Sequence, residues 1–147
     1  MGALTLPTSG LVYVDTMTVI YTVERMLPYA PSLQPLWLAA QAQSVEVVSS
    51  ELTLMETLVG PLKSGDSVVE AAFEQMLSGA DTRLLPITQP ILREAARLRA
   101  ITKLRTPDAI HAATSKSVGC VLFVTNDVGF RAVTGLPVVI LDDLLKP

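Results

Sequence analysis

The chain has 147 residues, half of them hydrophobic, with a mean hydropathy of +0.46 and a net charge of −3, so it can form one domain with a buried core. No apolar run approaches the roughly 20 residues of a membrane-spanning helix, and the N-terminal MGALTLPTSG lacks the basic region of a signal peptide. We therefore expect a cytoplasmic protein with no membrane partner. A single cysteine, Cys120, excludes an internal disulfide bond.

The first half of the chain alternates apolar strand patterns with helical patterns. Residues 1–9 are expected to be a flexible N-terminus, and the apolar run at 11–15 predicts a buried strand. A helix is expected after it, up to the prolines near residue 30. Apolar residues spaced by three and four then predict a helix at 32–43, and residues 45–49 predict a second strand.

The second half continues the alternation, beginning with Ser50, which we expect to cap a helix. Pro107 favours the start of a later helix at Thr106, because proline suits the first helical turn. The predicted elements after Ser50 are helices at 51–62 and 67–77, a strand at 82–87, helices at 89–103 and from 106, a strand at 120–125, a short helix at 126–133 and a strand at 137–141.

This order predicts a single α/β domain over residues 1–147, built as three layers, α/β/α, around a central, mainly parallel sheet. Parallel sheets of this kind carry functional residues at the carboxyl ends of their strands. Attention therefore falls on the segments that follow the first, second and fourth predicted strands.

Three acids occupy such positions, a fourth lies at the start of a later helix, and each has a structural alternative. Asp15 ends the first strand and Asp127 follows the fourth, where either could cap a helix. Glu56 lies on the helix after the second strand, and Thr53 three residues earlier also fits a capping box. Asp108 lies in a first helical turn, where the helix dipole favours an acid.

Together, the four acids indicate a metal site. Two carboxylates about 4 Å apart repel by about 4 kcal/mol at an effective dielectric near 20, so a cluster requires a cation or raised pKa values. Oxygen ligands without supporting histidine or cysteine favour Mg²⁺ or Mn²⁺, which suit phosphodiester hydrolysis. The acidic net charge is unusual for a protein that binds RNA, but without these four acids it would be +1.

Four segments of the sequence resemble the motifs of PIN domains, especially the VapC-type toxins of prokaryotic toxin–antitoxin pairs. In chain order they are VYVDTMTVIYTVE, SSELTLMETLVG, RTPDAIHAATS and FVTNDVGF, which carry Asp15, Glu56, Asp108 and Asp127. The resemblance covers essentially the whole chain. One departure is Met17, which stands where the family often has asparagine.

The resemblance implies a PIN-like fold and a metal-dependent endoribonuclease, the toxin of a type II toxin–antitoxin pair, that uses Mg²⁺ or Mn²⁺. The four acids would be the catalytic and metal-binding residues, with Thr16, Thr125 and Asn126 in support. It also implies a homodimer and an antitoxin protein as partner. The alternative is a PIN-fold RNA-associated or scaffold module with little or no nuclease activity, which the net charge and Met17 favour.

A basic segment precedes Asp108 and supplies candidate contacts for RNA phosphates, namely Arg105, Lys103 and Arg99. The alternative is a solvated helix face. His111 lies three residues after Asp108, on the same side of the predicted helix, where a supporting role is favoured over metal binding.

Overall fold

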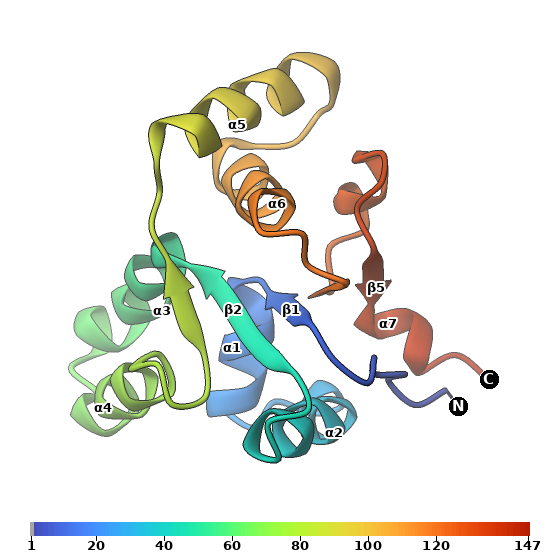
Figure 1. Ribbon diagram of the computed structural model, residues 1–147. Helices are drawn as coiled ribbons and strands as arrows, with labels where there is room; N and C mark the ends of the chain where they lie inside the picture. Colours follow the sequence, from blue (N-terminus) through green and yellow to red (C-terminus); the bar gives the residue numbers. More distant parts are fainter. Residues whose placement is uncertain (1) are drawn as a thin grey trace.

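The computed structural model describes residues 2–147, which form a five-stranded sheet with helices on both faces (Figure 1). The strand order is β3-β2-β1-β4-β5, and every pairing is parallel. The strands are β1 (Leu11–Val14), β2 (Glu46–Ser50), β3 (Arg83–Leu85), β4 (Leu122–Thr125) and β5 (Val138–Ile140). The predicted three-layer α/β/α architecture is confirmed.

The sheet is buried on both faces because successive side chains of its central strands enter two different cores. In β1, Val12 and Val14 contact one core while Tyr13 between them contacts the other. In β4, Phe123 and Val124 divide in the same way.

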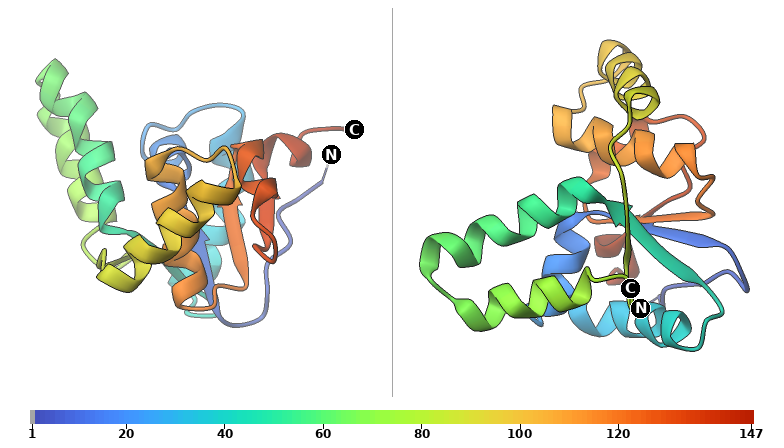
Figure 2. Two further views of the ribbon diagram at one scale, coloured as in Figure 1. Left: turned by 90° about the horizontal axis from the view of Figure 1, so that it is seen from above. Right: turned by 60° about the vertical axis from the view of Figure 1, so that its left-hand side comes forward.

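One face of the sheet packs against α1 (Thr16–Val23), α2 (Tyr29–Gln41), α4 (Ser67–Met76) and α7 (Leu141–Leu144). The other packs against α5 (Gln89–Ile101) and α6 (Thr106–Ser117), which form a helical pair beyond β1 and β2. The remaining helix, α3 (Glu51–Ser64), leaves the carboxyl end of β2 and pairs with α4, and the two project away from the sheet (Figure 2). A short 3₁₀ helix, η1 (Val128–Ala132), follows β4.

Local sequence signals account for several helix starts. The Ser50 hydroxyl accepts a hydrogen bond from the Leu52 backbone N–H, so α3 begins where its cap was predicted. The carboxylate of Asp15 accepts from the Thr18 backbone N–H at the start of α1. Pro107 lies in the first turn of α6, which starts at Thr106 as expected.

Other boundaries differ from the sequence-based prediction. Helix α2 begins at Tyr29 rather than residue 32, because Pro31 falls in its first turn, where no backbone N–H donor is required. Strand β3 keeps only three of the six residues predicted at 82–87, and α5 ends at Ile101, two residues early. The four-residue helix α7 was not predicted, since one turn is too short to show periodicity.

The N-terminal segment contacts the folded domain. The backbone N–H of Gly2 donates to the carbonyl of Leu144, and Leu4 is buried in the core that contains α2 and α7. Residues 1–9 were expected to be a flexible N-terminus, and Met1 of that segment lies outside the described residues.

A row of aromatic rings links the sheet to η1. Tyr13 stacks on Phe123 with ring centres 5.0 Å apart and planes inclined by 4°. Phe123 also contacts Phe130, whose ring centre is 4.7 Å away. The three rings therefore join β1, β4 and η1 beneath the carboxyl end of the sheet.

No helix among residues 2–147 is both long enough and apolar enough to cross a bilayer.

Candidate active site

A pocket of about 350 Å³ opens at the carboxyl end of the sheet, where the predicted acids meet. Asp15 reaches it from the end of β1, Glu56 from α3, Asp108 from α6 and Asp127 from the turn after β4. This convergence follows from the strand order, because β1 lies between β2 and β4 and their carboxyl ends share one edge. The other lining residues are Thr16, Met17, Ile20, Tyr21, His111 and Asn126.

Asp15 lies deepest, with 6% of its surface exposed. One carboxylate oxygen, Oδ1, accepts from the backbone N–H and the hydroxyl of Thr18, at 3.1 and 2.8 Å. The other, Oδ2, accepts from the Thr125 hydroxyl at 2.5 Å. Burial raises the pKa of Asp15 above its ordinary value, although these hydrogen bonds act in the opposite direction.

Thr125 connects two of the acids. Its hydroxyl donates to Asp15 and accepts from the backbone N–H of Asp127 at 3.1 Å. The Asp127 carboxylate in turn accepts from the Gly129 N–H, at the start of η1. A single hydroxyl at the end of β4 thus sets the relative positions of Asp15 and the turn that carries Asp127.

The negative charge of Asp127 acts on Asp108 through space. Desolvation raises the pKa of Asp108, and the negative charge of Asp127 raises it further. Asp108 is half-buried, whereas Asp127 is exposed. The repulsion between them would be relieved by a cation in the pocket.

Glu56 is held by partners from two other helices. Its Oε1 accepts from the Thr16 hydroxyl at 2.6 Å and lies 3.1 Å from Nε2 of His111. Burial raises the pKa of Glu56, but the hydrogen bonds from His111 and Thr16 outweigh it and the net shift is downward. Glu56 therefore stays ionised at neutral pH.

The pocket fits a divalent cation by its donor chemistry. Four carboxylates line it, and none of the ten described residues around it is lysine or arginine. No three His, Cys, Asp or Glu side chains within residues 2–147 are close enough to form an ion-binding cluster by themselves. Asp15, Glu56 and Asp127 each accept hydrogen bonds from neighbouring protein donors at the edge of the pocket.

The two remaining predicted supporting residues lie at the pocket. Thr16 holds Glu56, as described above. The side chain of Asn126 donates to the Tyr21 hydroxyl at 3.4 Å and accepts from the backbone N–H of Asp142 at 2.8 Å. Asn126 therefore ties the turn after β4 to α1 and α7. Met17, 43% exposed, forms part of the rim.

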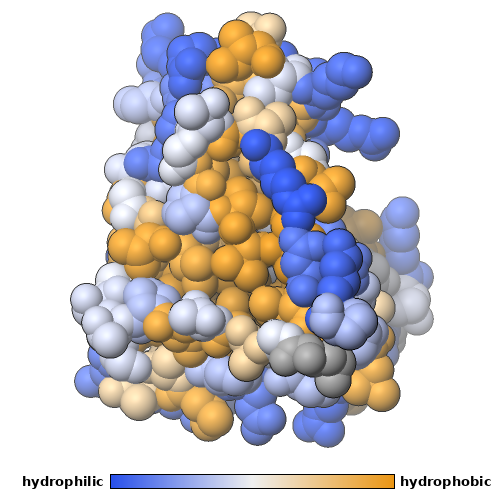
Figure 3. Space-filling model, turned by 90° about the vertical axis from the view of Figure 1, so that its right-hand side faces the viewer, coloured by the Kyte–Doolittle hydropathy of each residue, from blue (hydrophilic) through white to orange (hydrophobic). Residues whose placement is uncertain are grey.

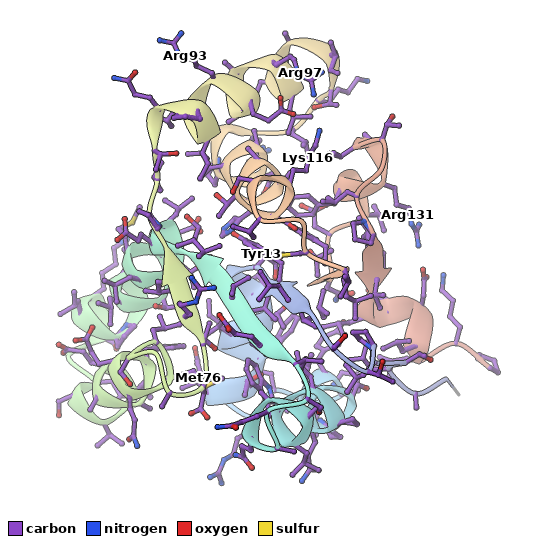
Figure 4. The ribbon with its side chains drawn as sticks, viewed as in Figure 1. Tyr13, Met76, Arg93, Arg97, Lys116 and Arg131 are labelled. Carbon is purple, nitrogen blue, oxygen red and sulfur yellow. The ribbon has the colours of Figure 1, made fainter. Side chains whose placement is uncertain are left out.

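The basic residues divide into two groups. Arg97 pairs with Glu94, which also binds Lys116 of α6, and Figure 4 shows Arg93 and Arg97 on α5, far from the sheet. Arg99 donates to the Leu104 carbonyl and to the Thr106 hydroxyl, so it fixes the α5–α6 turn. Among the three predicted RNA contacts, Arg99 thus has a structural role in the turn.

Lys103 and Arg105 line a second pocket of about 460 Å³. This pocket shares Asp108 and Asp127 with the first, so the two hollows lie on either side of the same pair of acids. An extended polyanion could therefore pass from the basic side chains to the acidic pocket.

The PIN domain family model matches residues 12–136. The chain belongs to the PIN domain family. No curated protein sequence matches it closely enough to support an argument.

Solved structures of similar fold come from toxin–antitoxin complexes. A chain of the VapBC2 complex of Rickettsia felis, bound to a DNA fragment from their promoter, has a TM-score of 0.73 at 16% identity, over 88% of this chain and 98% of that one. A toxin–antitoxin complex from Klebsiella pneumoniae gives 0.65 at 24% identity, over 88% and 97%. A chain of VapBC-5 from Mycobacterium tuberculosis gives 0.57 at 26% identity, over 91% and 98%.

Sequence reasoning did not identify the polar groups behind the acids. Tyr13 and Thr53 are fully buried and contact His111 and Thr16, respectively. In the sequence, Tyr13 reads as one more hydrophobic residue of a buried strand. Its polar contact is with His111, 98 residues further along the chain, and only the folded structure brings the two together. Thr53 had a signal, since it lies three residues before Glu56 on the same helix face.

Proposed function

We propose that this PIN domain is a metal-dependent endoribonuclease and the toxin of a type II toxin–antitoxin pair, acting in the cytoplasm. The observation that carries the proposal is the convergence of Asp15, Glu56, Asp108 and Asp127 on one pocket whose described lining includes no lysine or arginine. The family membership and the fold similarity to chains of toxin–antitoxin complexes support it.

In this proposal, Asp15, Glu56 and Asp127 hold a Mg²⁺ or Mn²⁺ ion, and Asp108 completes or orients a second position. A divalent ion so held lowers the pKa of bound water and stabilises charge on phosphate oxygens. Thr125, Thr18 and Thr16 keep the carboxylates of Asp15 and Glu56 in place by donating hydroxyl hydrogens. Lys103 and Arg105 bind the RNA backbone in the adjoining pocket.

The decisive experiment compares RNA cleavage by the wild type and by Asp15→Asn, both purified free of contaminating nuclease. Asparagine is nearly isosteric and still caps α1, so the variant should fold. We expect cleavage in Mn²⁺ to be abolished, while circular dichroism and thermal melting show a folded chain. Asp81→Asn, which changes an acid outside the pocket, is the matched control and should cleave normally. Undiminished cleavage by Asp15→Asn would refute the proposal.

The second candidate is a PIN-fold RNA-associated or scaffold module without nuclease activity. Met17 on the pocket rim favours it, because a thioether is a poor ligand for Mg²⁺ or Mn²⁺. A metal titration separates the two functions. An active site should bind Mn²⁺, whereas no binding together with no cleavage of mixed RNA would favour the module.

We further propose two protein partners, an antitoxin and a second copy of the chain. The similar structures include a toxin–antitoxin complex and a member of the VapBC family of toxin–antitoxin systems, which supports the first. Apolar side chains gather on the face of the molecule at the β5 side of the sheet, and a homodimer would cover such a surface (Figure 3). Light scattering on the purified chain, alone and co-expressed with the small protein of a neighbouring reading frame, measures both assemblies.

A further inference from the structure

His111 lies at the centre of a buried chain of polar contacts. Its ring is 3% exposed, on the face of α6 that packs against β1. Nδ1 lies 2.6 Å from the Tyr13 hydroxyl, and Nε2 lies 3.1 Å from Oε1 of Glu56. The same Nε2 lies 3.3 Å from the Thr16 hydroxyl. Four elements, β1, α1, α3 and α6, thus meet through one imidazole.

The partners determine the direction of each hydrogen bond. An ionised Glu56 only accepts, so Nε2 of His111 carries a hydrogen and donates it. In a neutral imidazole the other nitrogen then accepts, so the Tyr13 hydroxyl donates to Nδ1. Tyr13 therefore selects the tautomer of His111 that can hold Glu56.

Tyr13 is itself immobilised by packing. It is fully buried, stacks on Phe123, and meets the His111 ring edge-on with ring centres 5.8 Å apart. Figure 4 shows it between the sheet and α6. Because packing already fixes the Tyr13 side chain, little further conformational entropy is lost when its hydroxyl orients the imidazole.

Glu56 depends on His111 and Thr16 because its own helix does little to fix the position of its side chain. Helix α3 projects from the sheet, and Met55 and Val59 beside Glu56 are exposed. Both hydrogen bonds to the Glu56 carboxylate, from Thr16 and from His111, reach Oε1. Within residues 2–147, Oε2 receives no hydrogen bond and remains available to a cation.

We propose that His111 is a positioning residue of the site. Oriented by Tyr13, it holds Oε1 of Glu56 so that Oε2 can bind the divalent ion. The proposal rests on the proposed metal-dependent function and extends it to two residues that act through Glu56 and not as ligands of the ion. Partners that orient metal ligands in this way typically change metal affinity or activity 10- to 100-fold when removed.

The test measures Mn²⁺ affinity by counting free Mn²⁺ with electron paramagnetic resonance, which does not depend on catalysis. The variants are Tyr13→Phe, which removes one hydroxyl, His111→Leu, which removes the donor, and His111→Gln, which restores an N–H₂ donor. Thr114→Val is the matched control, because Thr114 is buried on α6 but bonds only to its own helix, at the Ile110 carbonyl.

We expect Tyr13→Phe and His111→Leu to weaken Mn²⁺ binding about 10-fold or more, and to lower kcat for RNA cleavage with little change in KM. His111→Gln should recover most of the affinity, and Thr114→Val should bind Mn²⁺ like the wild type. Because His111 acts through Glu56, His111→Leu should have no additional effect in a Glu56→Gln background.

Wild-type affinity in both Tyr13→Phe and His111→Leu would overturn the inference alone, since the metal site would exist without this support. An equal loss in His111→Leu and His111→Gln with no loss in Tyr13→Phe would also overturn it. A wild-type chain that binds no Mn²⁺ would overturn the proposed function and this inference together. If His111→Leu does not fold, Tyr13→Phe decides, because it retains the stacked ring.

Discussion

At the residue scale, the Thr125 side chain positions Asp15 and Asp127, the two acids of the pocket that lie furthest apart in the sequence. Its hydroxyl donates to the buried Asp15 carboxylate and accepts from the backbone of Asp127. A charged acceptor deprived of its donor inside a protein costs about 1–3 kcal/mol or more. The hydroxyl therefore contributes to stability as well as to the shape of the pocket.

Thr125→Val tests this dependence, because valine keeps the volume and the β-branch of threonine while removing the hydroxyl. We expect the free energy of unfolding at neutral pH to fall by about 1–3 kcal/mol, measured by urea denaturation. Thr125→Ser retains the hydroxyl and should lose less, as the removal of one methyl group costs about 1 kcal/mol. A valine variant more stable than the serine variant would contradict the prediction.

The acids themselves could be identified from the sequence because each stands beside a strand end or in a helix segment that local patterns locate. The Ser50 cap, for example, placed Glu56 inside α3 rather than at its start. The groups that orient the acids could not be identified in this way. The contact of Tyr13 with His111 depends on how α6 packs on β1, which no local pattern specifies.

At the scale of elements, the α5–α6 pair separates the basic residues by function. Arg99 is engaged within the turn, whereas Lys103 and Arg105 line the pocket next to Asp108 and Asp127. The sequence predicted one basic face on this segment. It could not separate these roles, because the turn at Thr102 redirects the chain between neighbouring basic residues.

Lys103→Gln and Arg105→Gln should each weaken RNA binding and reduce the salt dependence of log K by about one unit of slope. The reason is that each removes a cation that displaces counterions from the phosphate backbone. Filter binding across a salt series measures the slope, with Asp15→Asn chains, which we expect not to cleave the RNA. Arg93→Gln, on the exposed outer side of α5, is the control. A slope unchanged in both pocket variants would exclude this surface as the RNA path.

Glu94 links α5 to α6 through Lys116 and also pairs with Arg97. The hydrogen bonds from Arg97 and Lys116 lower the pKa of Glu94 to about 2. Because the folded-state pKa lies below the ordinary value of 4.5, the ionised carboxylate stabilises the fold above pH 4.5, and this contribution disappears as the pH falls toward 2.

Glu94→Gln should therefore lower Tm slightly at neutral pH, by an amount that corresponds to less than about 1 kcal/mol, because the pair is partly solvated. The difference from the wild type should shrink as the pH falls from 4.5 toward 2. Thermal melts over this range measure it, with Glu74→Gln, exposed on α4, as the control. A difference that is independent of pH would show that the ion pair contributes nothing.

The secondary structure was more predictable than its boundaries. All five strands were expected in order, since short apolar runs bounded by turn residues are strong signals in a sheet that is buried on both faces. The ends of the helices and strands were less predictable because tertiary contacts determine where each element stops. Strand β3 pairs only with β2, over three residues. The apolar sequence pattern at 82–87 is therefore longer than the hydrogen-bonded strand.

At the scale of the whole molecule, a bound cation should stabilise the fold, because the pocket is assembled from four elements that separate on unfolding. At a Mn²⁺ concentration 100 times Kd, the gain is about 2.7 kcal/mol. We expect Tm to rise with Mn²⁺ in the wild type and in Asp81→Asn, and to rise much less in Asp127→Asn. Equal rises in all three would place the ion elsewhere on the molecule.

The stack of Tyr13, Phe123 and Phe130 gives a single core position influence over the whole site. Phe123 supports the tyrosine behind His111 on one side and the 3₁₀ turn after Asp127 on the other. A smaller residue there, as in Phe123→Leu, would leave a cavity in the core while every polar side chain of the site is retained. The result would be a heat-sensitive protein, folded at low temperature and unfolded at a temperature at which the wild type stays folded. If the chain is a toxin, cells could express such a temperature-sensitive variant at high temperature without damage, and cooling would then allow it to fold and act.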